Sequence, residues 1–502
     1  GFTLGGLDLD NSTLTLGSAT TDLTLDIGDS SDNGTDSGSP PGTLATQTAD
    51  LTVVGGIPSL SSGTTISSTG GTFTFGDGLS ISGATVNLQN STLALGGSFS
   101  NTGGSLTLSG TDLELLSNLS LGSDAAFTVD ELRLEDKTLN LQSVSSFTVA
   151  DLLVLDNTNE QITWDNTSLA LNGGLKLDTN GELTWKNPGN LAIGNITLNG
   201  GVLKIGKTTG SQTFVLDNST NLTLTADSEI YFNGGSILNY SGAEVSLGKI
   251  LTLGGSGQLQ NTNDLNLGAG GKLKLSEISV AKVITSADSL GLKIDNDTTI
   301  TSLSVSNLTP VSITDGKSLS GGITVNTGGT VQLADNGTLA SNISMNGGTI
   351  DADESLTVSG TVTQAGNATI DVASGKTITF DNGTISTENY QLTLEGAGTV
   401  AFPANASGIV LNHADGLLKL NGTGTLGAAQ ITVASATGKG VQVVKSSSIS
   451  DLKVLADTKL NIASVKTLSG SVEVAANKTL SLSGTGTLGS GLNLLGTLEA
   501  GA

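Results

Sequence analysis

The chain has 502 residues, 36% of them hydrophobic and only 13% charged, and its formal net charge is −25 at pH 7. Because a surplus of acidic side chains repels nucleic-acid phosphates and anionic lipid headgroups, we expect no nucleic-acid partner and no basic membrane-binding patch. Cysteine is absent and histidine occurs once, which excludes disulfides, thiolate metal centres and multi-histidine metal sites.

The rest of the composition is typical of extended strands joined by tight turns. Gly is abundant, with 70 residues, whereas Pro, Met and Trp are rare. Leu, Ile and Val dominate the apolar residues, and Ser, Thr and Asn make up most of the remainder. Such a composition favours strands over helices. No apolar run approaches the ~18 residues of a membrane-spanning helix, so we expect an all-β chain without a membrane span.

Residues 1–25 predict the first β-strands. Leu-Thr-Leu triplets at 14–16 and 23–25 alternate between apolar and polar side chains, which is the period of a half-buried strand. Gly1 does not begin a signal peptide, so we expect a processed chain or a segment of a longer polypeptide.

Residues 26–45 predict an acidic loop that leaves the β-structure, because this segment is rich in Gly and Ser and contains Pro40 and Pro41. The stretch Asp29–Gly34 resembles the first half of a calcium-binding loop, but Pro40 occupies the position where a bidentate Glu would be needed. Two interpretations therefore stay open for this segment, a calcium site and a solvated loop without a ligand.

Residues 46–502 repeat an apolar pattern at a regular interval. Four apolar residues recur 20 positions further along the chain: Phe127, Val129, Leu132 and Leu134 are followed by Phe147, Val149, Leu152 and Val154. Ile162–Asn166 returns after 21 positions as Leu183–Asn187, and Thr327–Val331 returns after 19 as Asn346–Ile350. Further Leu-Thr-Leu triplets mark strands at 106–108, 222–224, 251–253 and 392–394.

Strands that recur every 19 to 21 residues predict a parallel β-solenoid over 46–502, with roughly 23 rungs of about 20 residues each, a rung being one complete winding of the chain. No rung can bury its apolar face alone, so stacking places like residues on like residues, for example Phe127 on Phe147. Outward side chains stack in the same way, and like charges directly opposite one another are destabilising. We therefore expect neutral columns of Thr, Ser and Asn on the outside.

Several short cassettes carry a resemblance to a known family. They are Asn346–Ile350, Gly375–Ile378 and Asn477–Leu482, set in a background rich in Gly, Ser, Thr and Asn. This sequence style resembles the passenger regions of autotransporter and filamentous-haemagglutinin-type adhesins over most of the chain. The resemblance implies a right-handed parallel β-helix of the pectate-lyase-like superfamily and a location at the cell surface. Polysaccharide lyases and hydrolases belong to the same superfamily, so the resemblance also raises the question of catalysis.

Glu131 and Asp151 are the strongest candidates for such catalysis. The 20-residue register places them one above the other at about 5 Å, near the separation of the two carboxylates in retaining glycosidases. No His, Tyr or Trp lies nearby in the sequence to form a sugar subsite. The alternative is an exposed corner at which Arg133 is a partial counter-ion, and this alternative leads us to expect no catalytic, cofactor-binding or metal-binding residue.

Three other residues allow a functional or a structural interpretation. Trp164 and Trp185 occupy equivalent positions and could form a platform for sugar rings. Alternation places them on the same side as Ile162 and Leu183, however, which favours packing in the core and would bring Asn166 and Asn187 into a ladder. His413, the single histidine, is expected at a turn or on the surface rather than as a base or ligand.

These patterns predict an extracellular, non-enzymatic β-solenoid, a structural or adhesive rod that serves as a surface adhesin or fibre segment. A carbohydrate-active β-helix enzyme is the alternative from another class, and an ice-binding solenoid is a third option that the irregular Thr positions disfavour. A cell-surface or matrix receptor or a glycan is the expected partner. End-to-end self-association is a further expectation, because neither terminus carries a recognisable polar cap.

Overall fold

The computed structural model describes residues 2–4, 13–16, 23–26, 43–46, 48–54, 57, 59–60, 62, 64–122, 126–141, 144–157, 160–164, 168–186, 191–207, 212–216, 220–275, 278–285, 290–403, 408–423, 425–435 and 438–500. These residues form sixty β-strands and no helix. Accordingly, the described part of the chain has no helix with the length and apolar character needed to cross a membrane. The chain divides into two compact units, Gly1–Ala243 and Glu244–Ala502.

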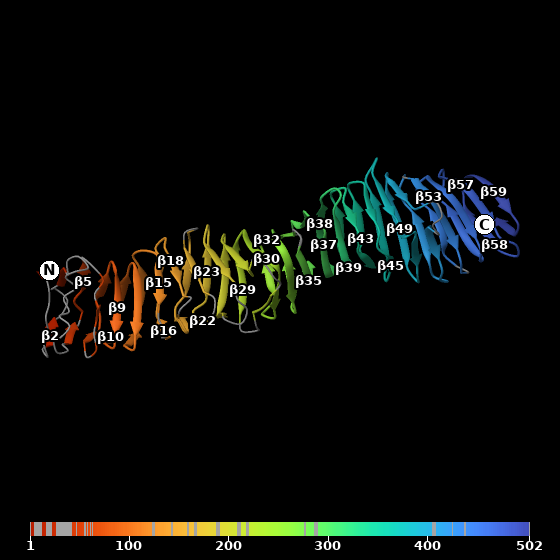
Figure 1. Ribbon diagram of the computed structural model, residues 1–502. Coiled ribbons are helices and arrows are strands. Elements are labelled where there is room, and N and C mark those ends of the chain that lie inside the picture. Colours follow the sequence, from red (N-terminus) through yellow and green to blue (C-terminus); the bar gives the residue numbers. More distant parts are fainter. Residues whose placement is uncertain are drawn as a thin grey trace. The chain divides into compact units, whose positions relative to one another are not determined.

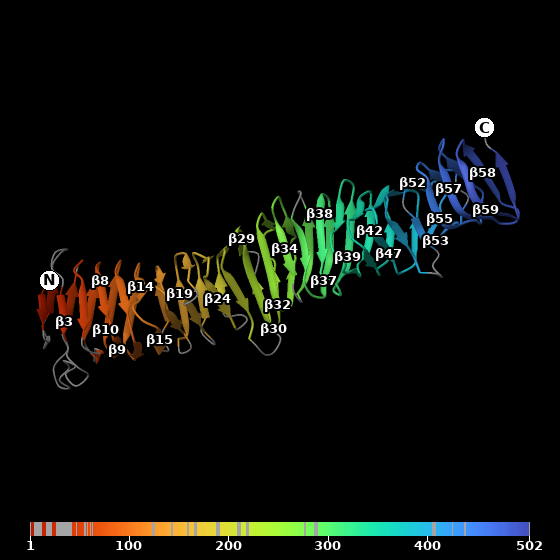
Figure 2. The same cartoon turned by 90° about the horizontal axis from the view of Figure 1, so that it is seen from above.

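In the first unit, from β5 to β15, three consecutive strands belong to three different sheets and the fourth strand returns to the sheet of the first. Figures 1 and 2 show the strands of this unit following one another along it. For example, β11 pairs with β8, whereas β9 and β10 lie in the other two sheets. The first sheet contains β1 (Phe2–Leu4), β3 (Leu23–Asp26), β5 (Leu51–Val54), β8 (Thr72–Phe75), β11 (Thr92–Leu95), β14 (Asp112–Leu115) and β17 (Leu132–Arg133). The second contains β2 (Thr13–Leu16), β4 (Thr43–Thr46), β7 (Thr65–Ser68), β10 (Thr85–Gln89) and β13 (Ser105–Ser109). The third contains β6 (Ser59–Leu60), β9 (Gly78–Ser82), β12 (Ser98–Thr102), β15 (Leu119–Gly122), β18 (Thr138–Asn140) and β21 (Gln161–Thr163).

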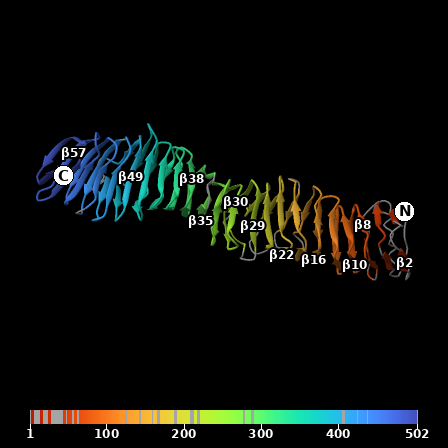
Figure 3. The same ribbon diagram turned by 180° about the vertical axis from the view of Figure 1, so that it is seen from behind.

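The later strands of this unit form further parallel ladders. Figure 3 shows β10, β16 and β22 following one another along one side. One ladder contains β16 (Ala126–Val129), β19 (Ser146–Val149), β22 (Ser168–Leu171) and β25 (Leu191–Ile193), and another contains β20 (Leu153–Leu155), β23 (Leu175–Asp178), β26 (Asn195–Asn199) and β29 (Asn221–Ala226). The remaining strands are β24 (Glu182–Trp185), β27 (Val202–Ile205), β28 (Thr213–Leu216) and β30 (Ser228–Tyr240).

The second unit continues the same parallel pairing from one rung to the next, as in the series β40, β43, β46, β49 and β52. Its strands are β31 (Val245–Leu247), β32 (Ile250–Asn261), β33 (Leu265–Leu267), β34 (Lys272–Leu275), β35 (Ile278–Thr285), β36 (Gly291–Ile294), β37 (Thr298–Val305), β38 (Leu308–Ile313), β39 (Ser318–Asn326), β40 (Thr330–Leu333), β41 (Thr338–Leu339), β42 (Asn342–Asn346), β43 (Thr349–Ala352), β44 (Leu356–Val358), β45 (Val362–Gln364), β46 (Ala368–Val372), β47 (Thr377–Phe380), β48 (Thr384–Thr387), β49 (Gln391–Gly396), β50 (Thr399–Ala401), β51 (Gly408–Leu411), β52 (Leu417–Leu420), β53 (Thr425–Val433), β54 (Gly440–Val443), β55 (Ser447–Val454), β56 (Thr458–Ile462), β57 (Thr467–Val474), β58 (Thr479–Gly484), β59 (Thr487–Leu494) and β60 (Thr497–Ala500).

This architecture confirms the predicted all-β parallel solenoid, with about 19 turns of about 21 residues each. The rungs are fewer and slightly longer than the roughly 23 rungs of about 20 residues that the repeats suggest. Some rungs are longer than this average. Val202 pairs with Glu229, which is 27 positions further on (229 − 202 = 27), and Gln391 pairs with Leu417, which is 26 further on (417 − 391 = 26).

The predicted stacking of identical residues is confirmed at the repeat that first indicated it. Phe127 pairs in register with Phe147, and their rings are stacked with centroids 6.2 Å apart. Both side chains are buried in the core. The next residue of each strand, Thr128 and Thr148, points outward, and these two residues also pair in register. The alternation of β-strand side chains therefore sorts this segment into a dry interior and a polar exterior.

The second half of the same repeat differs from the prediction. Leu152 and Val154 were expected to repeat the buried Leu132 and Leu134, but their side chains are 45% and 38% exposed. The buried residues are instead Leu153 and Leu155. One extra residue lies at this corner, since Val149 is four positions from Leu153 whereas Val129 is three from Leu132. A shift of one residue moves every following side chain to the opposite face of a strand.

The predicted loop at 26–45 overlaps strands at both ends, with Asp26 in β3 and Thr43 in β4. Residues 27–42, including the possible calcium ligands from Asp29 onward, lie outside the described part of the chain. On either side of them the same sheets continue, because β2 pairs with β4 and β3 pairs with β5.

Glycine at a corner allows the backbones of two neighbouring rungs to lie close together. Gly78 begins β9 with a φ of 127°, and a Cβ atom at this position would lie 2.2 Å from the backbone oxygen of Ser98 in the next rung. An L-residue would therefore require both an unfavourable backbone conformation and a displaced neighbour.

Two leucines of β59 are more exposed than the residues they pair with. Leu492 and Leu494 pair with Val472 and Val474, which are fully buried, yet the two leucines themselves are 41% and 44% exposed. Their side chains continue the apolar columns of the interior.

Candidate functional site

The corner that contains Glu131 joins β16 to β17 and carries a small ionic cluster. The guanidinium of Arg133 contacts the Glu131 carboxylate at 2.7 Å and that of Asp112, in the preceding rung, at 3.2 Å. The side chains of Glu131 and Arg133 are about two-fifths exposed. The cluster is therefore an open surface ion-pair group of the kind that contributes little net stability.

The electrostatics of this cluster do not suit Glu131 as a general acid. The hydrogen bond from Arg133 holds the pKa of Glu131 below its usual value, whereas a general acid needs a raised pKa. Burial raises the pKa of Asp112. Asp151 is exposed, its backbone amide donates to the carbonyl oxygen of Asp130 at 2.8 Å, and no described contact joins its carboxylate to that of Glu131. The described geometry supports the counter-ion interpretation of Arg133.

Trp164 and Trp185 belong to the core, as the alternation predicts. Their side chains are 0% and 1% exposed, so neither can offer a ring face to a sugar. The Trp185 ring packs edge-on against Phe214 with centroids 4.9 Å apart. The ladder predicted for Asn166 and Asn187 falls on residues outside the described part of the chain.

His413 lies just after β51, at an exposed turn, as predicted. Its Nδ1 accepts a 3.4 Å hydrogen bond from the backbone amide of Asp415, and its carbonyl oxygen accepts one from Gly416. The imidazole thus closes a local turn. Within the described ranges, no group of three or more His, Asp or Glu side chains has a metal-binding arrangement.

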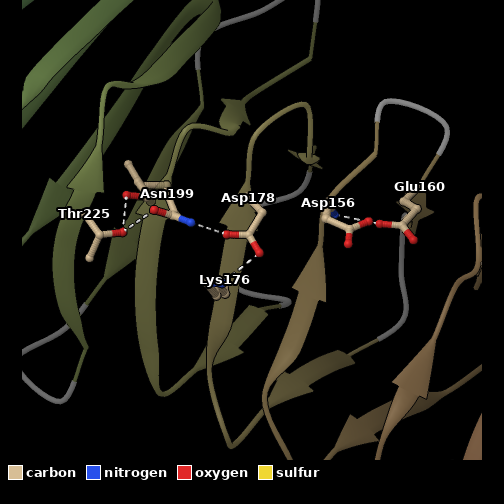
Figure 4. Close-up of polar contacts among 7 residues, drawn as sticks. Asp156, Glu160, Lys176, Asp178, Asn199 and Thr225 are labelled. Carbon is tan, nitrogen blue, oxygen red and sulfur yellow. Dashed lines mark hydrogen bonds and ion pairs between the residues drawn. The ribbon is translucent and has the colours of Figure 1, made fainter.

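Polar side chains with defined partners mostly connect one rung to the next, as Figure 4 shows for a column in the first unit. Asn199 donates its amide to the Asp178 carboxylate of the preceding rung, and Thr225 of the following rung donates to the Asn199 oxygen at 2.8 Å. Burial disfavours ionisation of Asp178, but the hydrogen bonds from Lys176 and Asn199 outweigh it and lower its pKa. The column holds Asp178 as a carboxylate in a structural role.

Glu160, in the same view, is a buried acid that also joins rungs (Figure 4). Its carboxylate accepts hydrogen bonds from the backbone amides of Asp156 at 2.8 Å and Asp136 at 3.4 Å. A carboxylate that satisfies backbone donors of two segments fixes a corner and leaves little capacity for a substrate.

A second column, in the second unit, is acidic and was not foreseen from the sequence. Asp351 of β43 pairs in register with Asp371 of β46, and Asp371 pairs with Glu395 of β49. We call these three residues the acidic ladder. It contradicts the expectation of neutral outward columns at this place, because three acids stand at neighbouring positions in successive rungs. Each acid follows a similar pair of residues, in Thr-Ile-Asp, Thr-Ile-Asp and Thr-Leu-Glu at 349–351, 369–371 and 393–395, but the three tripeptides recur at unequal intervals.

A shallow hollow of about 300 Å³ lies beside β25 and β28 in the first unit. Its walls include Leu191, Ile193, Val215 and Thr220, together with Asn172, and its described lining contains no ionisable side chain. Such a lining offers neither an acid nor a base for hydrolysis or elimination.

Comparison with models of protein families and with curated proteins finds no match to this chain.

Proposed function

We propose that this chain is a structural β-solenoid segment of an extracellular surface adhesin or fibre, and that it acts by presenting binding surfaces rather than by catalysis. The observation that carries the proposal is that polar side chains form hydrogen bonds from one rung to the next. In the column of Asp178, Asn199 and Thr225, the hydrogen-bonding groups serve neighbouring rungs and do not converge on a space for a substrate. The resemblance to autotransporter and filamentous-haemagglutinin-type passengers agrees with this role.

The proposed partners are a receptor or glycan of a cell surface or matrix. The outward faces support binding of this kind, because they are lined with short hydroxyl and amide side chains. Ser80 and Ser100 are hydrogen-bonded across adjacent rungs at 3.0 Å, and Asn195 and Asn221 at 3.1 Å. A regular array of such groups on a pre-ordered surface can bind an extended ligand with little loss of side-chain entropy.

Self-association is the second proposed interaction, and it rests on exposed apolar side chains of β59. Leu492 and Leu494 are 41% and 44% exposed, whereas their register partners Val472 and Val474 are fully buried. Exposed apolar side chains that lie side by side favour association with another apolar surface. We propose that a second copy packs against them.

The function is tested by measuring binding and turnover on the same protein. We expect the purified chain to bind saturably to at least one immobilised matrix protein or surface glycan, and to release no product from acidic or neutral polysaccharides. The matched variant combines Glu131→Gln with Asp151→Asn, and we expect it to bind as the unchanged chain does. Product formation by the unchanged chain that this variant loses would establish the carbohydrate-active alternative.

A further inference from the structure

The acids of the acidic ladder occupy three successive positions of one column. The described ion pairs include none with Asp351, Asp371 or Glu395. All three side chains are partly buried. Neighbouring strands of a sheet are about 4.8 Å apart, so the three acids stand on adjacent strands on the same side of the sheet.

Amides bound the ladder at both ends. Gln332 of β40 pairs in register with Asp351 but donates its side-chain amide to Asp353 at 2.7 Å, which leaves Asp351 without that donor. Asn421, directly after β52, donates to the Glu395 carboxylate at 2.7 Å. Asp351 therefore receives no described hydrogen bond from a side chain. Asp371 accepts one from the backbone of Val372, and Glu395 accepts the one from Asn421.

The surrounding charges do not neutralise the ladder. Asp353, beside β43, adds a further negative charge that acts on Asp351 and Asp371. Lys445, just after β54, acts on Asp371 from a distance, and Lys419 of β52 pairs in register with Thr393, two residues before Glu395. Lys376 and Glu354, at the neighbouring corner, form an ion pair with each other.

We propose that the acidic ladder is a proton-controlled brace of the second unit, in which a proton shared between Asp351 and Asp371 tightens the packing of β43 against β46 in mildly acidic surroundings. The protonated carboxyl donates an O–H···O hydrogen bond to the neighbouring carboxylate, a type of bond that is short and strong. Deprotonation replaces this bond with the repulsion of like charges in adjacent rungs.

The titration of the ladder supports this direction. Burial, followed by the charges of Asp353 and Asp371, raises the pKa of Asp351 to about 6, and burial and Glu395 also raise the pKa of Asp371. A carboxyl whose pKa is higher in the folded chain than the usual 3.8 binds its proton more tightly when folded. Its contribution to stability is complete below the unfolded pKa and is lost as the pH rises through about 6.

Denaturant unfolding of the full chain at pH 7.5 and pH 5.0 tests the proposal. We expect acidification to lower the unfolding equilibrium constant by about tenfold through this ladder, after allowing for the screening of half-exposed groups. Asp351→Asn should be more stable than the unchanged chain at pH 7.5 and should lose most of this pH effect, whereas Asp371→Asn should lose part of it, because burial and the charge of Asp353 still act on Asp351. The control Asp315→Asn changes an exposed acid elsewhere in the unit and should keep the effect, so that general loss of net charge is subtracted.

Three outcomes would overturn the proposal. Equal pH dependence in the unchanged chain, Asp371→Asn and Asp315→Asn would show that no proton is shared at the ladder. A loss of stability at pH 7.5 in both Asp371→Asn and Asp351→Asn would show that the charges are favourable as they stand. Stabilisation of the unchanged chain by calcium chloride at pH 7.5, abolished by EDTA and absent in Asp371→Asn, would assign the ladder to a cation instead of a proton.

Discussion

The aromatic side chains around Phe127 show how single residues hold neighbouring rungs together. Phe127 stacks on Phe147 and meets Phe99 edge-on at 5.3 Å, so it contacts rings on both sides. Each such pair contributes about 0.5–1.5 kcal/mol beyond the burial of its area. The side chain is only 2% exposed, so little water reaches it.

Phe127→Asp is therefore expected to destabilise the first unit by about 3 kcal/mol or more, because it places an unpaired charge in a dry core. The matched control is Thr128→Asp, the same new side chain at the adjacent outward position, which should cost a few tenths of a kcal/mol. Both values come from denaturant unfolding. Similar costs for the two variants would show that Phe127 does not face the core.

The alternation of apolar and polar residues indicates which side chains are buried where it is unbroken, and misplaces them where it is interrupted. Phe127, Phe147, Trp164 and Trp185 were placed in the core correctly, because each lies within a short run of strict alternation. Leu152 was placed wrongly, because an apolar residue at a corner looks the same in sequence as one in a strand. Only the length of the corner distinguishes the two, and that length follows from the three-dimensional packing of the rungs.

At the scale of strands, the outward columns act as ladders of short side chains. Thr128 pairs with Thr148, and elsewhere Thr299 and Ser320 share a hydrogen bond of 2.8 Å across adjacent rungs. Side chains directly opposite one another in a sheet interact by roughly 0.2–1 kcal/mol, with a sign that depends on their charge.

Thr128→Lys combined with Thr148→Lys should accordingly cost more than the two single changes added together, by roughly 0.5–1 kcal/mol. The two new ammonium groups would lie in register on adjacent strands. Thr128→Lys combined with Thr324→Lys, in the other unit, is the control and should be additive. Additivity in both double variants would mean that Thr128 and Thr148 are not neighbours.

The strands and their parallel pairing could be predicted from the repeats, but not the acidic ladder. The interval from Asp351 to Asp371 is 20 residues and that from Asp371 to Glu395 is 24, so no fixed period aligns all three. The general rule that stacked charges are avoided also argued against such a column. The degree of burial of the three acids and the positions of the neighbouring amide side chains are known only once the strands are placed in three dimensions.

At the scale of the whole molecule, the proposed packing of a second copy against the exposed Leu492 and Leu494 predicts association between copies. Sedimentation at increasing protein concentration should show assembly, and Leu492→Asp with Leu494→Asp should reduce it strongly by charging the apolar face. Leu455→Asp changes a leucine of similar exposure, 48%, in the preceding part of the unit and should leave assembly intact. A chain that stays monomeric at high concentration would refute this contact.

The class of fold follows from the sequence because every rung repeats the same physical problem of burying one apolar face. Function does not repeat in this way. Glu131 and Asp151 were close in the expected register, yet the Glu131 carboxylate contacts Arg133, whose hydrogen bond lowers its pKa. Whether two acids form a catalytic pair depends on the side-chain contacts at the corner, and the periodic pattern of the sequence does not predict those contacts.

Cysteine pairs test the parallel in-register stacking most directly, since the chain has no native cysteine. Thr128→Cys with Thr148→Cys, and Thr324→Cys with Ser344→Cys, join residues that pair between adjacent rungs. Such residues are about 4.8 Å apart, within the range of a disulfide. Under mild oxidation we expect both pairs to cross-link within one chain, as measured by thiol titration and mass spectrometry of peptides.

The control pairs are displaced by two residues, Thr128→Cys with Ser146→Cys and Thr324→Cys with Asn342→Cys, which places the two Cα atoms about 8 Å apart, too far for a disulfide. The account predicts rapid cross-linking of the in-register pairs and little in the displaced pairs. Cross-linking of the displaced pairs in preference to the in-register pairs would contradict it.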